Sequence, residues 1–197
     1  MKLYDISQEL LTSVVFPGDP APERSVLASL EKGDICNLSH LSLCAHNGTH
    51  IDAPCHFIAG GKAVDEIALS KLVGYCYVAE FNGTLTANDA AALLRCAKVR
   101  SSEAAKRILL KGKATVSLEA AEVFVKAGIE LIGNESQTVG PEDAPLAVHR
   151  VLLAREVVLL EGIRLSQVPS GVYLLSAAPI SVKGADGSPC RAILIEL

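Results

Sequence analysis

The sequence predicts a single α/β or mixed α+β domain, with strands at both ends of the chain and helices between them. Segments 2–10 and 192–197 have the residue pattern of strands, and 118–127 has that of an amphipathic helix. The length of 197 residues suits one domain with a substantial core. No repeat, low-complexity tract or linker divides the chain, so residues 1–197 are expected to form one domain.

Composition argues against several classes of protein. Half of the residues are hydrophobic and 20% are charged, which is ordinary for a compact soluble protein. The net charge is −4, no basic run occurs and aromatic residues make up only 4%, so nucleic-acid binding has little support. No apolar run approaches the ~20 residues that cross a bilayer, so no membrane association is expected.

The N-terminal residues do not resemble a signal peptide, which favours a cytoplasmic location. Six cysteines are scattered without the Cys-x-x-Cys spacing of many metal and redox sites. In an unsecreted chain they are expected to be reduced and mostly buried.

The first part of the chain is expected to form short strands and turns. Strands are predicted at 2–10, 24–30, 35–44 and 75–81, turns at 16–20 and 31–34, and a short helix at 63–72.

Helices with clear end signals follow. Thr86 can cap a helix that runs to about Val99, and a strand is expected at 107–111. Ser117 can cap a helix over 118–127, which Gly128 would end.

The last part alternates again between strands and helices. Asp143 is a natural N-cap and Pro145 suits the first turn of a helix that places His149 beside its apolar stripe. The remaining predictions are strands at 130–133, 157–161, 171–178 and 192–197, a helical turn at 165–168 and a turn at 184–189.

The most informative stretch runs from His46 to Phe57. His46, His50, Asp52 and His56 all occupy even positions, so in an extended strand their side chains would share one face. Packing four such groups together is costly unless they bind partners or a metal ion. A single strand histidine, by contrast, is more often a hydrogen-bonded core or surface residue, and we interpret His40 in that way.

Helix is the competing conformation, because His46 and His50 are also four residues apart. Gly48 and Pro54 disfavour it and instead allow a strand to bend. A bent strand that offers two imidazoles and a carboxylate makes a three-ligand metal site with room for water. Cys55 would point to the other face.

Glu161 ends an apolar run typical of a strand buried on both faces. A carboxylate there needs a cation or hydrogen-bond donors unless the strand has reached solvent. The residues alone leave both readings open.

The pattern His46-x-Gly-Thr-His50-x-Asp52-x-Pro-x-His56 resembles the signature of the cyclase-like metal-dependent hydrolases, which include bacterial kynurenine formamidases. Phe16-Pro-Gly-Asp19 is similar to an early loop of this family. Leu159-Leu-Glu161-Gly162 and the segment 184–193 resemble its C-terminal signatures.

The resemblance implies a swivelling β/β/α fold of mixed sheets with flanking helices, and a homodimer or higher homo-oligomer in which the neighbouring subunit helps to close the pocket. It also implies one divalent ion, Zn²⁺ or Mn²⁺, held by His46, His50 and Asp52. A second ion would share Asp52 and be completed by His149 and Glu161. His56 would then be the catalytic proton donor and acceptor.

Two departures from the family pattern bear on the substrate. Ile132-Gly-Asn-Glu135-Ser-Gln-Thr stands where many relatives have Ile-Gly-x-Asp-x-x-Ser, which predicts an altered polar wall. Phe16 stands where kynurenine formamidases usually have Trp, and an aromatic substrate could still stack on it.

The implied activity is hydrolysis of a small-molecule amide by metal-bound hydroxide. The first candidate is an arylformamidase of tryptophan catabolism, which converts N-formyl-kynurenine to kynurenine and formate. The alternatives are a cyclic-amide hydrolase of the isatin type in the same family, and a non-catalytic metal-binding protein. Neither a G-x-S-x-G elbow nor a nucleotide-binding fingerprint is present.

Overall fold

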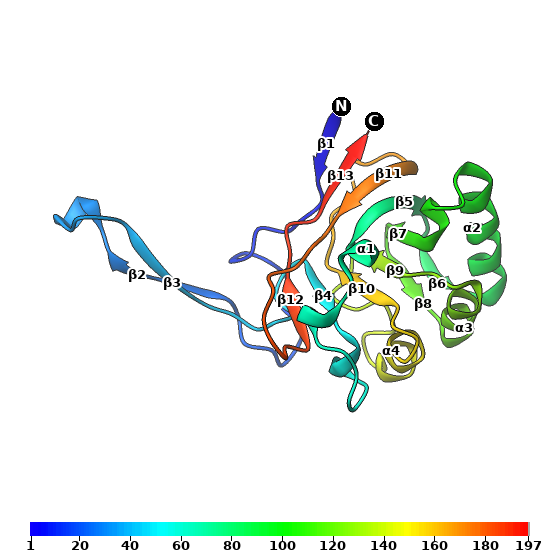
Figure 1. Ribbon diagram of the computed structural model, residues 1–197, viewed down its shortest axis with the longest axis horizontal. Helices are drawn as coiled ribbons and strands as arrows, with labels where there is room; N and C mark the ends of the chain where they lie inside the picture. The colour runs from blue at the N-terminus through cyan, green and yellow to red at the C-terminus, as the bar shows by residue number, and fades with distance from the viewer. Residues whose placement is uncertain (197) are drawn as a thin grey trace.

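The computed structural model describes residues 1–196, and a nine-stranded mixed sheet forms its centre (Figure 1). In order across the sheet, the strands are β1 (Lys2–Asp5), β13 (Ile193–Glu196), β11 (Gly171–Ser176), β5 (Val73–Glu80), β7 (Arg107–Lys111), β9 (Leu131–Asn134), β10 (Val158–Glu161), β4 (His50–Asp52) and β12 (Gly187–Pro189). The central strands β5, β7, β9 and β10 pair in parallel, and antiparallel strands extend the sheet on both sides. The mixed α/β architecture is therefore confirmed.

Helices α2 (Ala87–Arg100), α3 (Leu118–Ala127) and α4 (Leu146–Leu153) pack side by side against the sheet (Figure 1). Neighbouring residues of a strand point to opposite faces, so each buried strand contributes side chains to the cores on both faces of the sheet. Leu159 packs in the core beneath the helices, and Leu160 packs in the core on the other face of the sheet. The apolar run that precedes Glu161 is thus buried on both sides.

Local capping explains where α2 and α3 begin. Thr86 accepts a hydrogen bond from the backbone N–H of Asp89, whose carboxylate accepts one from the N–H of Thr86. Ser117 accepts from the N–H of Ala120 at the start of α3. Gly128 ends α3 with a φ of 73°, a conformation that costs glycine little. Both predicted helices are confirmed.

A two-stranded arm projects from the body of the protein (Figure 1). It consists of β2 (Glu23–Ala28), a 3₁₀ turn (Leu30–Lys32) and β3 (Leu38–Ser42), and we call residues 23–42 the arm. Its strands are shorter than predicted. His40, which we interpreted as an ordinary structural histidine, lies exposed on this arm. The smaller elements of the body are α1 (Leu69–Leu72), β6 (Gly83–Leu85) and β8 (Ala114–Val116), of which β6 and β8 pair in parallel.

Several predicted boundaries were wrong. The strand expected at 2–10 ends at Asp5, because its partner β13 begins at Ile193 opposite that residue. The helix expected at 63–72 is broken by extended backbone at Ile67. Asp143 does not cap α4, since the residue before the helix is Pro145.

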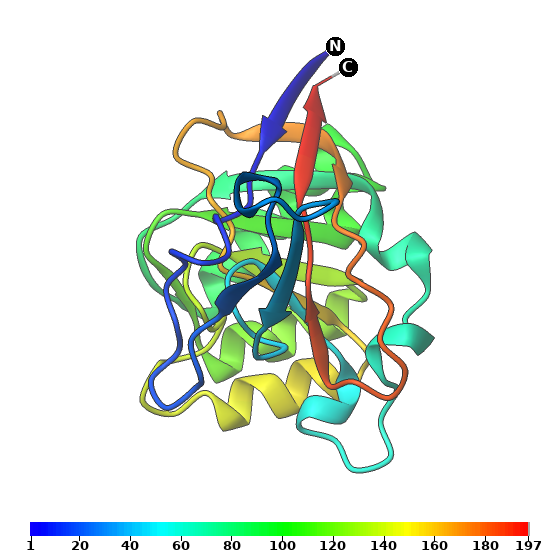
Figure 2. The ribbon, with the colours of Figure 1, turned by 90° about the vertical axis from the view of Figure 1, so that its left-hand side faces the viewer.

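The chain ends were placed correctly. β1 and β13 pair as neighbours, so the two termini lie close together (Figure 2). The final residue of the strand expected at 192–197, Leu197, is outside the described residues.

The cysteines are free, as expected, but only Cys76 is fully buried, so the expectation of mostly buried thiols was wrong. Among residues 1–196, no helix has the length and apolar character needed to cross a membrane.

Candidate metal centre

The site is built around β4, which lies between two antiparallel neighbours. His50 pairs with Glu161 of β10, and Asp52 pairs with Gly187 of β12. His50 and Asp52 are two residues apart and share a face, as their parity predicted. Directly opposed residues of an antiparallel pair also share a face, so Glu161 joins them. Register alone therefore brings one imidazole and two carboxylates together.

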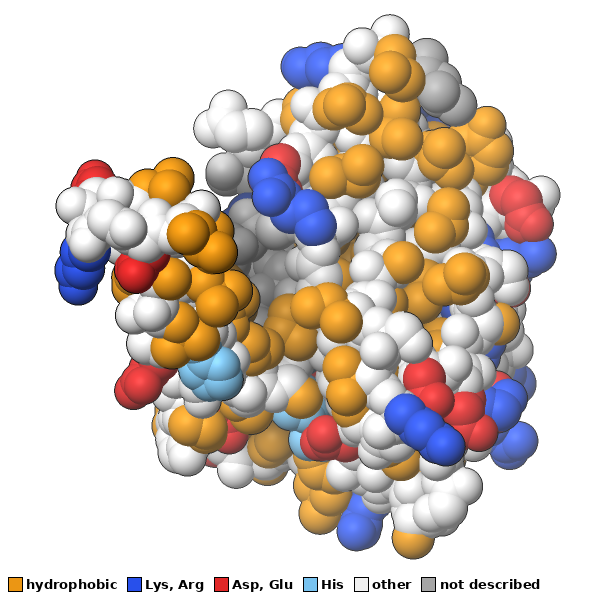
Figure 3. Space-filling view, turned by 60° about the vertical axis from the view of Figure 1, so that its left-hand side comes forward, with side chains coloured by type: hydrophobic (Ala, Val, Ile, Leu, Met, Phe, Trp, Pro, Cys, Tyr) orange, Lys and Arg blue, Asp and Glu red, His pale blue; other side chains and the backbone are white. Residues whose placement is uncertain are grey.

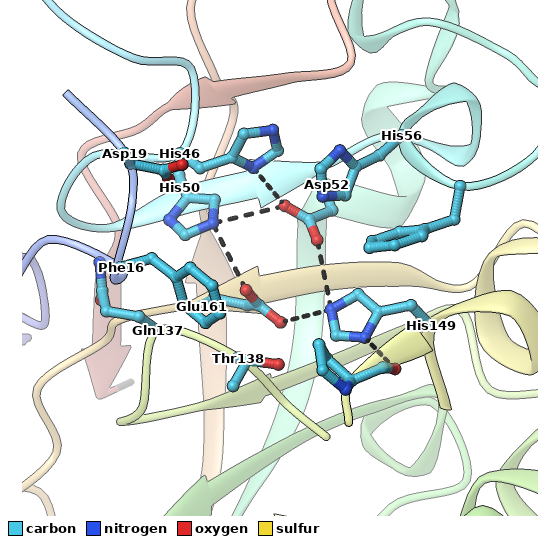
Figure 4. Close-up of a pocket in the computed structure, with 12 residues that line it drawn as sticks. Phe16, Asp19, His46, His50, Asp52, His56, Gln137, Thr138, His149 and Glu161 are labelled. Carbon is cyan, nitrogen blue, oxygen red and sulfur yellow. Dashed lines mark hydrogen bonds and ion pairs between the residues drawn. The ribbon is translucent and has the colours of Figure 1, made fainter. Parts of the chain in front are cut away.

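His46 and His56 reach the same place from bends on either side of β4. Gly48, with a φ of 67°, turns the chain after His46. His56 ends a 3₁₀ helix that begins at Pro54. The predicted bends at Gly48 and Pro54 are thus present, although His46 and His56 lie outside the strand itself. Figure 4 shows that the side chains of His46 and His56 lie beside those of His50 and Asp52.

His149 comes from the opposite side, on α4. Val148 and Leu152 pack into the core, while the buried imidazole of His149 turns towards the carboxylates (Figure 4). Its Nδ1 lies 2.8 Å from the carbonyl oxygen of Pro145, one turn earlier. Pro145 itself has no N–H to offer the helix, but its carbonyl orients this ring.

The donor atoms form two groups that share Asp52. On one side, Asp52 Oδ1 lies 2.9 Å from His46 Nδ1 and 3.3 Å from His50 Nε2. On the other side, Asp52 Oδ2 lies 3.7 Å from His149 Nε2, which is 3.3 Å from Glu161 Oε1. Glu161 Oε2 lies 3.4 Å from His50 Nε2 and so also reaches the first group. A carboxylate with one oxygen in each group is arranged as a bridge.

In each candidate ligand histidine, the ring nitrogen that does not face the carboxylates of Asp52 and Glu161 has a hydrogen-bond acceptor of its own. His50 Nδ1 lies 3.1 Å from the carbonyl of Gly48, and His46 Nε2 lies 3.0 Å from Asp186 Oδ2. When these nitrogens carry the protons, His50 Nε2 and His46 Nδ1 present lone pairs to the carboxylates. Metal-binding histidines are usually oriented in this way.

Charge in the cluster is balanced by protons when no cation is bound. Burial disfavours charged histidines, but the hydrogen bonds and charge of Asp52, together with Asp186 at His46 and Glu161 at His50, outweigh it and raise the pKa of His46 to about 9 and of His50 to about 10. Burial also opposes ionisation of Asp52, yet hydrogen bonds from both histidines hold its pKa well below the usual range. The pKa of His149 is raised, because the hydrogen bond and charge of Glu161 outweigh burial. A divalent cation could replace these protons.

The donor set fits such a cation on its chemistry. Five nearly buried side chains offer only imidazole nitrogens and carboxylate oxygens, which suit Zn²⁺ and Mn²⁺ alike. The Val139 N–H donates to Glu161 Oε1 at 2.7 Å and fixes that carboxylate. The groups are prearranged by strand pairing and helix packing, as a metal site requires.

The donors lie in a pocket of about 210 Å³. Its lining residues come from the early loop, the β4 region, the segment after β9, α4 and β10: Phe16, Asp19, His46, His50, Asp52, His56, Phe57, Gln137, Thr138, Pro145, His149 and Glu161. The pocket is therefore large enough for a small molecule beside the donors.

Comparison with known proteins identifies the family of this chain. A family model described as "Putative cyclase" matches residues 4–141. The chain belongs to the cyclase family. Among curated members, it is 32% identical to a kynurenine formamidase of Salinibacter ruber, with 98% of this chain and 97% of the relative covered. It is 29% identical to the enzyme of the same name from Erythrobacter litoralis, over 100% of this chain and 94% of the relative.

Solved structures agree on the fold of the cyclase family. A "predicted metal-dependent hydrolase" from Bacillus stearothermophilus superposes with a TM-score of 0.81 at 27% identity, covering 98% of this chain and 97% of the other. Isatin hydrolase A of Labrenzia aggregata superposes with a TM-score of 0.84 at 21% identity, covering 98% and 93%. At that identity the second likeness concerns the fold alone. The chain is accordingly a hydrolase of the cyclase family.

The structure brings together every site residue that the sequence analysis named. Phe16, His56 and the five ligand candidates all line the pocket (Figure 4). Glu161 is buried, so its strand has not emerged into solvent. Cys55 points elsewhere and contacts the carbonyl of Ala185.

The segment 132–138, where this chain departs from the family pattern, contributes two residues to the pocket but not Glu135. Glu135 does not form part of the polar wall, because its carboxylate accepts hydrogen bonds from the backbone N–H groups of Gly112 and Leu165. Gln137 and Thr138 line the pocket from this segment instead.

Sequence reasoning missed three residues of the site. Phe57 packs against both His56 and His149, with ring centroids 4.3 and 4.9 Å away. Asp186 contacts two histidines, although its segment was noted only as a family signature. Thr138 lines the pocket with a buried hydroxyl that has no protein hydrogen-bond partner among the described residues. Its segment was named as an altered polar wall, but Thr138 itself was not singled out.

Proposed function

We propose that this member of the cyclase family is a metal-dependent arylformamidase, which hydrolyses N-formyl-kynurenine or a closely similar aryl formamide. The observation that carries the proposal is Asp52, whose two oxygens face separate groups of donors on the floor of the pocket. The full-length likeness to curated kynurenine formamidases supports the choice of substrate.

In this proposal His46, His50 and Asp52 hold one divalent ion, and Asp52, His149 and Glu161 hold a second. The two groups of donor atoms, each within 4.8 Å of one another, support a two-ion site. Zn²⁺ and Mn²⁺ are both compatible with nitrogen and oxygen ligands, so either is proposed. When bound, the cation supplies positive charge that polarises the amide carbonyl and makes bound water more acidic.

The protein's own groups complete the reaction. Water adds its oxygen to the carbonyl carbon, and the proton it loses passes to the imidazole of His56. The carbon–nitrogen bond then breaks, and His56 returns that proton to the leaving nitrogen, which gives formate and a free aryl amine. A histidine in this role suits proton transfer near neutral pH. His56 is less buried than the ligand candidates, with 27% of its side chain exposed.

Apolar rings border the pocket on the substrate side. Phe16 and Phe57 line it together with Pro145. We propose that the aryl group of the substrate packs on Phe16, since offset or edge-on contact between rings is favourable. Phe57 packs on the rings of His56 and His149 and so steadies the catalytic histidine against one wall.

Activity and metal content test the proposal together. Protein loaded with Zn²⁺ or Mn²⁺ is expected to hydrolyse N-formyl-kynurenine. His56→Ala should lower kcat by roughly 10²–10⁴-fold while metal content stays unchanged. His40→Ala, which removes an exposed histidine on the arm, is the matched control and should keep full activity. Loss of metal from His56→Ala would make His56 a ligand and contradict its proposed role.

The same assay separates the alternatives. Isatin hydrolysis opens a cyclic amide by the same chemistry, and the fold shared with isatin hydrolase A makes it the second candidate. Faster turnover of isatin than of N-formyl-kynurenine would select it. Full metal content without hydrolysis of either substrate would instead favour a non-catalytic metal-binding protein.

We also propose that the protein forms a homodimer through the arm. Val26, Leu27, Leu38 and Leu41 of the arm are each at least half exposed, and apolar side chains cover much of it (Figure 3). Val26 and Leu27 are consecutive, so both faces of the hairpin are apolar. An isolated two-stranded hairpin is only marginally stable in water, which favours an arm packed against a second copy of the chain. The cytoplasmic location and the role in tryptophan catabolism stay predictions.

A further inference from the structure

One carboxylate outside the proposed ligand set touches two histidines of the site. Asp186 Oδ2 lies 3.0 Å from Nε2 of His46 and 3.1 Å from Nδ1 of His56. The two rings lie next to each other, with centroids 4.1 Å apart and planes inclined by 31°. A single oxygen therefore accepts from a candidate metal ligand and from the candidate proton carrier.

This contact selects the tautomer of His56. A neutral imidazole carries one N–H, and a carboxylate can only accept while it is ionised. The N–H of His56 must then be at Nδ1, which leaves the lone pair on Nε2. Among the described residues, Asp186 is the only hydrogen-bond partner of the His56 ring. Without it, no hydrogen bond from residues 1–196 would distinguish the two nitrogens.

The backbone fixes Asp186 to the strand that carries the metal ligands. Its carbonyl accepts from the N–H of Ala53 at 2.9 Å, and the next residue, Gly187, pairs with Asp52. On the other side, the carbonyl of Ala185 accepts from the N–H of Val64 at 2.9 Å. Asp186 is thus tied to both the start and the end of the segment that holds His56, so its carboxylate is prearranged although half of it is exposed.

We propose that Asp186 is a positioning residue for the reaction. It holds His56 with Nε2 as the basic atom that takes and returns the proton, and it orients His46 through the same oxygen. This inference rests on the proposed role of His56 in hydrolysis. Removal of such hydrogen-bond partners of site histidines typically costs 10–100-fold in activity or metal affinity.

A third cation held by His46, His56 and Asp186 is the competing reading, since their ligand atoms also cluster within 4.8 Å. It would require His46 to bind cations through both nitrogens and therefore to lose both ring protons. Two N–H···O hydrogen bonds account for the same distances without that cost. Metal analysis separates the two readings.

The test compares Asp186→Ala and Asp186→Asn in the full-length, metal-saturated protein. Asp186→Ala should lower kcat by about 10–100-fold with little change in KM and in metal content. Asp186→Asn retains an acceptor oxygen and should recover part of the loss. Asp65→Ala is the matched control, because Asp65 anchors the same loop through the N–H of Gly184 without touching a histidine. It should keep kcat within about 3-fold.

Two further measurements exclude a merely structural effect. In a His56→Ala background, Asp186→Ala should cost less than about 3-fold, because a residue that acts through His56 has nothing left to position. Nitrogen-15 NMR of the zinc-loaded protein should show His56 protonated at Nδ1, and Asp186→Ala should shift the ring towards the other tautomer.

The outcomes are distinguishable. Equal losses from Asp186→Ala with and without His56, an unchanged tautomer, or loss of one equivalent of metal would each overturn the inference. If His56→Ala abolishes hydrolysis while Asp186→Ala has no effect, only the inference fails. If His56→Ala stays fully active, the proposed proton carrier is wrong and the inference fails with it.

Discussion

Replacing Gly187 by alanine probes how tightly β12 packs against the candidate ligand His46. A Cβ at Gly187 would lie 2.6 Å from His46 Cε1 and 2.9 Å from the carbonyl oxygen of Ile51. Ordinary van der Waals contact begins at 3.4 Å, so the His46 ring would have to move by about 0.8 Å (3.4 minus 2.6). The Ile51 carbonyl belongs to the β4 backbone and cannot give way as a side chain can.

We expect two measurable consequences of Gly187→Ala. Overpacking of this kind typically costs about 1–3 kcal/mol, so the free energy of unfolding of the metal-free protein should fall by that amount. Displacement of His46 should also weaken metal binding about 10–100-fold, which corresponds to ~1.4–2.8 kcal/mol. Denaturant unfolding in chelator and competition with a metal-binding dye measure the two effects separately.

Gly171→Ala in β11 is the matched control. A Cβ there would meet Tyr173 at an ordinary 3.7 Å, and three strands of the sheet separate β11 from β10. It should leave metal affinity unchanged and alter stability by less than about 1 kcal/mol. If Gly187→Ala binds metal as tightly as the unmodified protein and unfolds at the same denaturant concentration, the proposed contact between β12 and His46 is refuted.

Three other predictions follow from the site and the arm. His149→Ala, which changes a residue of the second group alone, should remove one equivalent of metal per chain and leave the other, as measured by elemental analysis; loss of neither or of both would contradict the two-group arrangement. The pKa values of His46 and His50 are raised to about 9 and about 10, so their stabilisation of the metal-free fold is complete below about pH 6.5 and is lost as pH rises to about 10. Apparent metal affinity should rise across the same window because cations displace those protons, and a flat profile in calorimetry would refute this. Leu27→Ser with Leu41→Ser should shift the protein from dimer to monomer in sedimentation without changing its helix content; a dimer that survives would remove the arm from the interface.

The donor residues could be predicted because local pattern and function coincide in them. His46, His50 and Asp52 are spaced by two and four residues, so a strand places these three polar side chains on one face. Glu161 follows an apolar run typical of a strand buried on both faces, but its role as a ligand was implied only by the resemblance to the family. Helices α2 and α3 could also be predicted from the sequence, since Thr86 and Ser117 cap them through contacts within three residues.

Features set by long-range pairing could not be predicted in this way. Segment 184–189 has the glycine and proline content of a turn, yet Gly187–Pro189 forms strand β12 because the free edge of β4 pairs with it. That pairing also positions Asp186, and no pattern in the neighbouring sequence predicts it. Asp143 has the composition of an N-cap, but the turn in which Ala144 donates to Pro141 precedes the helix and leaves Pro145 at its start.

The most direct test of the metal centre is anomalous X-ray scattering from crystals of the protein loaded with Zn²⁺ or Mn²⁺. We expect two peaks per chain, one on each side of the Asp52 carboxylate, the first beside His46 and His50 and the second beside His149 and Glu161. Peaks that avoid Asp52, or none within bonding distance of these five side chains, would contradict the account.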